Sequence, residues 1–262
     1  MSTSSNSTNL ASTAQLRPLL VPALQDTEFD SDRGFFPLPV RQREKNPAII
    51  AMDSPLVAMI YERWWRPAFG RVLKGFSGPS MADEYTIAAE LMDIQPGNTV
   101  LDLACGPGNF TRRFAALVGS GGLAVGFDAS EAMLERAHQD NEAAGASNIA
   151  LVRGDASALP FGDATFDSVC CYAALHMFSE PMLTLDEIAR VLKPGGRVTL
   201  LTSCRPSGPE VVGQISKAIS DASGQKMFGR NEITGELQDR GFLITKQIVG
   251  GLHQTLGAKL SA

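Results

Sequence analysis

The segment Val100-Leu101-Asp102-Leu103-Ala104-Cys105-Gly106-Pro107-Gly108-Asn109 decides the fold. Its first half is a short apolar run typical of a buried strand, and its second half is a glycine turn that leads into a helical pattern over 109–118. In an open parallel sheet, ligands bind at the carboxyl ends of the strands. Gly106 and Gly108 would let the backbone approach a ligand, and the helix start would offer free N–H groups to an anion. A tight turn without any ligand would use the same residues, so this motif alone assigns no function.

Acidic residues follow at the ends of the next two expected strands. Asp128 closes the strand over 123–127, 20 residues after Gly108, and a carboxylate at that position can bind both hydroxyls of a ribose. This spacing suits NAD and S-adenosylmethionine equally. The third glycine of a dinucleotide-binding fingerprint would fall at Thr111, so the NAD pattern is incomplete. Asp155 follows the third strand, where it could accept a hydrogen bond from the exocyclic amine of an adenine.

Strand and helix patterns alternate around this segment. Expected strands lie at 100–104, 123–127, 149–152, 166–172 and 197–203, and expected helices lie at 81–92, 109–118, 131–144, 182–192, 210–223 and 232–238. This alternation predicts an α/β fold with a doubly wound, Rossmann-like parallel sheet covered on both faces. Two last strands, over 242–249 and 252–259, have no room for a crossover helix and must be antiparallel. We expect a seven-stranded sheet with an antiparallel C-terminal hairpin.

The first 98 residues divide into two parts. Residues 1–45 open with a run of Ser, Thr and Asn that cannot bury enough apolar surface to fold, so we expect a disordered or loosely docked tail, with Phe35 and Phe36 as its anchors if it docks. The tail lacks the features of a secretory signal, whereas a transit peptide stays open. The pattern becomes globular from residue 46. This predicts an N-terminal helical cap over 46–98 and an α/β domain over 99–262.

Composition narrows the classes of function. The chain has 262 residues, with 23 basic and 28 acidic side chains and a net charge of −5. This balance argues against a general binder of phosphate backbones, so we expect no nucleic-acid partner. No apolar run reaches the ~18 residues that span a bilayer. The four cysteines form no C-x-x-C pair and the three histidines are scattered, so we expect no metal site and a reducing, cytoplasmic setting. The oligomeric state is not predicted.

Together these segments resemble the class I S-adenosylmethionine-dependent methyltransferases, and most closely their small-molecule branch of ubiquinone and menaquinone biosynthesis, methyltransferase type 11. The matching segments, in the family's order and spacing, are VLDLACGPGNF (100–110), VGFDASEAML (125–134), RGDASALPF (153–161), FDSV (166–169) and EIARVLKPGGRV (187–198). The resemblance implies S-adenosylmethionine as cofactor and methyl transfer to oxygen or carbon of a small, partly apolar acceptor. An RNA or protein acceptor is the alternative. It is disfavoured because Cys171-Tyr172-Ala173-Ala174 stands where an Asn-Pro-Pro-Tyr-type motif would lie.

The resemblance also implies roles for single residues. Gly106 and Gly108 would pass under the methionine part of the cofactor, and Asp102 would hold its ammonium side through the glycine turn. Asp128 would bind the ribose and Asp155 the adenine amine. Further cofactor contacts carried over from the family are Ala104, Ala129, Met133, Ala156 and Tyr172. Met133 would pack on the adenine, or alternatively serve as a core residue of its helix.

A narrower resemblance lies upstream. The segment Tyr61-Glu62-Arg63-Trp64-Trp65-Arg66 is similar to a methyltransferase branch found in bacteria and plant plastids. It implies that Tyr61 could reach the cofactor's carboxylate, or else simply dock its helix. The Cys-rich zinc module that many members carry is not recognisable, because no cysteine precedes Cys105.

His176 is the candidate catalytic residue. It lies just beyond the fourth expected strand, where the family places substrate-side residues. An unperturbed histidine pKa near 6.5 suits a general base that accepts a hydroxyl proton. The alternative is a histidine that only shapes the acceptor pocket.

Overall fold

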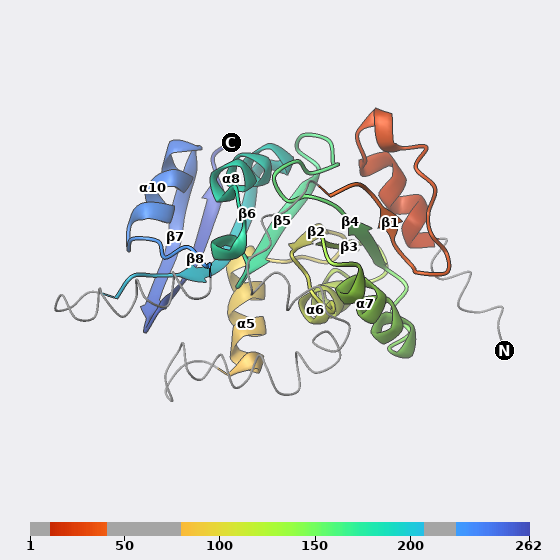
Figure 1. Cartoon of the computed structure of the whole chain (residues 1–262), viewed down its shortest axis with the longest axis horizontal. Helices are drawn as coiled ribbons and strands as arrows, with labels where there is room; N and C mark the ends of the chain where they lie inside the picture. The colour runs from red at the N-terminus through yellow and green to blue at the C-terminus, as the bar shows by residue number, and fades with distance from the viewer. Residues whose placement is uncertain (1–10, 41–79, 207–223) are drawn as a thin grey trace.

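The computed structural model describes residues 11–40, 80–206 and 224–262. Within these residues, eight strands form one sheet in the order β1-β4-β3-β2-β5-β6-β8-β7 (Figure 1). The strands are β1 (Phe36–Pro37), β2 (Thr99–Leu103), β3 (Leu123–Asp128), β4 (Ile149–Arg153), β5 (Phe166–Tyr172), β6 (Leu192–Ser203), β7 (Phe242–Gly250) and β8 (His253–Leu260). The pairs β6–β8 and β7–β8 are antiparallel, and the other pairs are parallel. The predicted α/β fold with its antiparallel C-terminal hairpin is confirmed, with one strand more than the seven expected.

Helices cover both faces of the sheet (Figure 1). One face carries α5 (Met81–Met92), α6 (Asn109–Val118) and α7 (Glu131–Ala143), and the other carries α8 (Pro181–Val191) and α10 (Glu232–Asp239). Short 3₁₀ turns occur at η1 (Arg17–Leu19), η2 (Pro22–Leu24) and η4 (Leu175–Met177). The helix expected over 210–223 lies outside the described residues, as does the 46–79 part of the expected cap.

Helix α5 begins with a capping box. The Ser80 hydroxyl accepts from the Asp83 N–H at 3.2 Å, and the Asp83 carboxylate accepts from the Ser80 N–H at 2.8 Å. This exchange satisfies two N–H groups that a helix start leaves without intrahelical partners. Tyr85, Ala88 and Met92 are buried on the helix face that meets the sheet. The last part of the expected cap is therefore a helix that covers the sheet.

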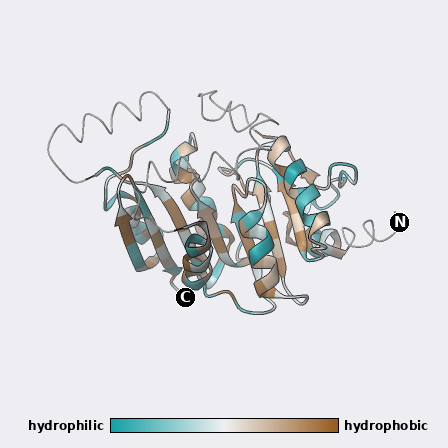
Figure 2. Ribbon diagram, turned by 90° about the horizontal axis from the view of Figure 1, so that it is seen from below, coloured by the Kyte–Doolittle hydropathy of each residue, from teal (hydrophilic) through white to brown (hydrophobic). Residues whose placement is uncertain are grey.

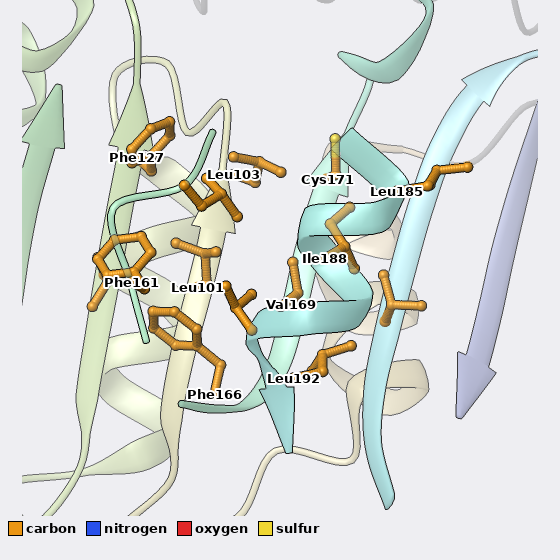
Figure 3. Close-up of a cluster of buried hydrophobic side chains, with 14 of the residues drawn as sticks. Leu101, Leu103, Phe127, Phe161, Phe166, Val169, Cys171, Leu185, Ile188 and Leu192 are labelled. Atoms are coloured by element: carbon orange, nitrogen blue, oxygen red, sulfur yellow. The ribbon is translucent and has the colours of Figure 1, made fainter. Parts of the chain in front are cut away.

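The core lies in two layers, one on each side of the sheet. Alternate residues of a strand point to opposite faces, so Leu101 and Leu103 of β2 enter one layer while Val100 enters the other. Figure 3 shows the first layer, where Leu185 and Ile188 of α8 pack over the strand residues Val169 and Cys171. Figure 2 shows brown, apolar stretches along the strands and teal, polar stretches on the outer sides of the helices. Parallel strands covered on both faces have this near-continuous apolar character.

Residues 11–40, here called the N-terminal arm, pack on the domain. Leu16, Phe35 and Phe36 are fully buried, and Phe36 pairs in parallel register with Val152 of β4. Phe35 enters the core layer of α5, α6 and α7, while Phe36 enters the opposite layer. Phe35 and Phe36 are thus anchors of a docked arm, as expected for a tail that docks, and residues 11–40 pack on the domain. Residues 11–16 are helical, and the rest of the arm forms two short 3₁₀ turns that contain prolines and a two-residue strand. These elements are too short to give a clear helical or strand periodicity in the sequence.

Candidate functional site

A glycine loop joins the end of β2 to the start of α6. Ala104, Gly106 and Gly108 adopt positive φ angles of 60°, 54° and 77°. A Cβ atom on Gly108 would lie 3.1 Å from the Cβ of Ala137, so this glycine allows α6 and α7 to approach closely. A Cβ on Gly106 would meet nothing within 4 Å and would project into open space. The loop thus exposes its backbone at Gly106, where a ligand could lie against it.

Asp102 lies beneath this loop. It is buried, and its Oδ2 accepts a hydrogen bond from the Thr111 hydroxyl at 2.5 Å. Thr111 belongs to the first turn of α6 and is fully buried. The carboxylate therefore anchors the start of the helix from below. Thr111 occupies the position of the third glycine in a dinucleotide-binding fingerprint. In this structure its hydroxyl instead joins α6 to Asp102.

Asp128 stands at the carboxyl end of β3. Its Oδ2 accepts from the Gly106 N–H and its Oδ1 from the Ser130 N–H, both at 2.9 Å. The first bond ties the glycine loop to β3, and the second fixes the turn into α7. Two backbone donors thereby set the direction of the carboxylate at the strand edge.

Asp155 follows the end of β4, the neighbouring strand. Its Oδ1 accepts from the Ser157 N–H at 2.9 Å and the Ser157 hydroxyl at 2.7 Å. The Gly154 N–H donates to the backbone oxygen of Asp128 at 3.1 Å, and a Cβ on Gly154 would lie 2.6 Å from the Phe127 ring. Only a glycine permits this close approach. The structure therefore brings Gly106, Asp128 and Asp155 together along one edge of the sheet.

The other predicted cofactor residues fall into two groups. Ala104, Ala129 and Ala156 are partly exposed in the loops at this edge. Met133 and Tyr172 are buried, and the Tyr172 ring packs 4.9 Å from that of Phe110, so both side chains belong to the core. The backbone after Tyr172 turns at Ala173, with φ of 60°. The prediction for Tyr61 falls outside the described residues.

His176 lies in η4, directly after β5. Burial lowers the pKa of His176 to about 4, so the imidazole is neutral at physiological pH. Its Nδ1 lies 3.5 Å from the Thr202 hydroxyl, and its backbone oxygen accepts from the Lys226 N–H at 2.8 Å. The expected pKa near 6.5 does not fit this environment. A base with a lower pKa is available at pH 7 but takes up a proton less readily.

The other titratable groups include the cysteines and the clusters of His, Asp and Glu side chains. Within the described residues, no group of three His, Cys, Asp or Glu side chains is placed to hold a metal ion. All four cysteines are buried, and none forms a disulfide. Burial and the nearby Asp128 carboxylate raise the pKa of Cys105 in the glycine loop, so its thiol stays protonated. In the part of the chain that the structure describes, no helix combines the length and apolar character needed to cross a membrane.

Arg112 supports the glycine loop, and the sequence did not single it out. It sits in the first turn of α6 and donates to the backbone oxygen of Pro107 at 2.8 Å and to Asn141 Oδ1 at 3.3 Å. These bonds connect the glycine loop to α7. The sequence shows only a basic residue four positions after Gly108. This does not distinguish Arg112 from an arginine on the exposed side of a helix.

The edge fits a ligand that carries a charged tail, a ribose and an adenine. The open space at Gly106 and the start of α6 would receive the tail, because the first N–H groups of a helix attract a carboxylate. Asp128 and Asp155, at the ends of adjacent strands, offer acceptors for ribose hydroxyls and an adenine amine.

Comparison with known proteins agrees with this geometry. Residues 100–196 match a family model described as a methyltransferase domain. The chain is 39% identical over 165 residues to an uncharacterised chloroplastic methyltransferase of Arabidopsis thaliana, a match covering 61% of this chain and 46% of that protein. It is 41% identical over 118 residues to demethylmenaquinone methyltransferase of Shouchella clausii, covering 45% of this chain and 50% of the relative. The chain thus spans about half the length of the curated relatives it matches.

Solved structures share the fold. A SAM-dependent methyltransferase from Aquifex aeolicus matches with a TM-score of 0.58 and 19% identity, covering 79% of this chain and 98% of that one. The matched residues 100–196 include the glycine loop and both strand-end carboxylates, Asp128 and Asp155. Residues 100–196 therefore match a methyltransferase domain, and the chain has the fold of a solved SAM-dependent methyltransferase.

Proposed function

We propose that this protein transfers the methyl group of S-adenosylmethionine to oxygen or carbon of a small, partly apolar metabolite. The observation that carries the proposal is the Asp128 carboxylate, which the Gly106 and Ser130 N–H groups orient at the edge that also bears Asp155. Relatives named demethylmenaquinone methyltransferase favour a small acceptor over RNA or protein. The net charge of −5 also disfavours RNA.

The cofactor supplies an electrophilic methyl group on a positively charged sulfur. The chain's own residues would hold it in place. The backbone at Gly106 and Gly108 would lie under the methionine part, and Asp102 would keep the loop and α6 in register through Thr111. Asp128 would accept from the ribose hydroxyls and Asp155 from the adenine amine. Backbone at Ala104, Ala129 and Ala156 would complete the adenosine walls, while Met133 would support the adenine side from the core.

The acceptor would enter beside η4, between the ends of β5 and β6. A neutral His176, with its Nδ1 near Thr202, would shape this side of the site and accept a hydrogen bond from the acceptor. We favour this pocket role over general-base catalysis because the pKa of His176 is about 4. Transfer then depends mainly on alignment of the attacking atom, the methyl carbon and the sulfur. The four buried cysteines, none in a disulfide, support a reducing, cytoplasmic setting.

A product screen tests the proposal. The purified protein is incubated with S-adenosylmethionine and, separately, with a metabolite extract, total RNA and a protein extract, and products are sought by the mass shift of one methyl group. We expect the shift in the metabolite fraction and its loss with Asp128→Ala. A shift confined to RNA or protein would replace the proposed acceptor, and the absence of any methylated product in all three fractions would argue for a binding protein without turnover.

A further inference from the structure

The N-terminal arm holds both ends of the loop that carries Asp155. Before the loop, β1 pairs Pro37 with Arg153, and the Leu38 N–H donates to the Arg153 oxygen at 3.2 Å. After the loop, the Val21 N–H donates to the Pro160 oxygen at 2.8 Å. The Gly162 N–H donates to the Leu19 oxygen at 3.0 Å. The arm is thus bonded to the chain on both sides of residues 154–159. Figure 1 shows the arm at the β1–β4 side of the sheet.

The arm also reaches the helix that follows Asp128. The Arg33 guanidinium donates to Glu131 and, at 2.9 Å, to Glu135, both on α7. The Glu131 carboxylate lies 3.2 Å from the guanidinium of Arg153. Glu131 is the first residue of α7, three positions after Asp128. The ion cluster Arg33–Glu131–Arg153 therefore joins the arm, the start of α7 and the end of β4.

The geometry of the arm fixes Arg33 in this place. The carboxylate of Asp30 accepts from the backbone N–H groups of Asp32 and Arg33, which forms a tight turn. At Gly34 the φ angle is 76°, and a Cβ there would lie 2.2 Å from the His138 ring of α7. The Arg33 guanidinium lies 4.8 Å from the centre of the buried Phe35 ring. Arg33 thus projects from a turn that is itself pressed against α7.

We propose that Arg33 is a positioning residue for the adenosine end of the cofactor site. It sets the start of α7 relative to the end of β4, and with it the spacing of Asp128 and Asp155. A binding constellation must be held within about 0.5 Å to work well, so a small shift between the two strand ends lowers cofactor affinity. The inference rests on the proposed roles of Asp128 and Asp155. It gives a segment of unremarkable composition a function in ligand binding.

The test compares Arg33→Met with Arg136→Met. Arg136 is also on α7 and pairs with Asp140 of the same helix at 3.0 Å. Its side chain is 40% exposed, against 32% for Arg33. The readout is the dissociation constant of S-adenosylhomocysteine by calorimetry, with melting temperature measured in parallel. We expect a five- to tenfold weakening for Arg33→Met, partial recovery for Arg33→Lys, and less than twofold for Arg136→Met.

A double-mutant cycle with Asp155→Asn separates positioning from general stability. If Arg33 acts through the adenosine site, the combined variant loses less affinity than the two single variants together. Additive losses, or a lower melting temperature with unchanged affinity, overturn the inference. Glu131→Gln removes the carboxylate shared by both arginines and repeats the test if Arg33→Met does not fold. Unchanged affinity in Asp128→Ala and Asp155→Asn would instead count against the proposed site, whatever Arg33 does.

Discussion

The glycine loop and the N-terminal arm both frame the carboxyl edge of the sheet, but their contacts differ in reach. The loop is held by bonds between near neighbours, since Asp102 and Thr111 are 9 residues apart and Gly106 and Asp128 are 22 apart. The arm is held by Arg33 and Glu131, which are 98 residues apart. Residues that bond over a short separation form a motif with a recognisable spacing in the sequence. Residues that bond over a long separation, such as Arg33 and Glu131, form no such motif. The comparison explains why one region could be predicted and the other could not.

The largest effect should come from breaking the arm. Phe36 is fully buried in the core layer that α8 and α10 cover, so Phe36→Ala should lower the free energy of unfolding by about 3–5 kcal/mol. Deletion of residues 1–40 should be more severe, because it also removes Leu16 and Phe35 from the core. Urea unfolding measures both, with Leu243→Ala, a 64% exposed side chain, as the control expected to stay within about 0.5 kcal/mol. If deletion of residues 1–40 left the free energy of unfolding unchanged, the claim that the arm contributes to the core would be wrong.

Alanine substitutions at the two loop glycines, Gly106 and Gly108, should affect protein stability and cofactor binding differently. Both have positive φ, so alanine at either position should strain the loop by about 1–2 kcal/mol. Gly108→Ala adds a contact 3.1 Å from the Ala137 Cβ and should lower stability further. Gly106→Ala places its methyl group in open space and should instead weaken S-adenosylhomocysteine binding more than its stability loss explains. Unfolding and calorimetry on both variants check this, and full cofactor affinity in Gly106→Ala would remove the loop backbone from the site.

A separate effect concerns pH and His176. Its pKa is lowered from 6.5 to about 4, so between these values the unfolded chain binds more protons at this residue than the folded chain. The stabilisation by His176 should therefore be complete above pH 6.5 and decline as the pH falls toward 4. Urea unfolding between pH 7 and 4 should show a shallower decline in His176→Gln. An NMR titration midpoint near 6.5 for His176 would refute the assignment and restore the general-base role.

The sequence predicted the features whose signals are local. The strand and helix alternation predicted the parallel sheet, and the short connection between the last two strands predicted the C-terminal hairpin. The acids at the ends of β3 and β4 fell where the strand ends predicted them. What could not be predicted was the side-chain environment: the burial that depresses the pKa of His176, the packing of Tyr172 against Phe110, and the docking of the arm. Each depends on residues that are distant in sequence and meet only in the folded chain.

The most direct test of the account is cofactor binding by Asp128→Ala. If this carboxylate holds the ribose hydroxyls, its removal deletes charge-assisted hydrogen bonds worth about 1.5–3 kcal/mol each. Calorimetry should show S-adenosylhomocysteine binding to the parent and at least tenfold weaker binding to the variant. The exposed acid variant Asp163→Ala should bind as the parent does, and NAD should not bind to any of them. A folded Asp128→Ala protein with unchanged affinity, or a parent that binds NAD alone, would contradict the account.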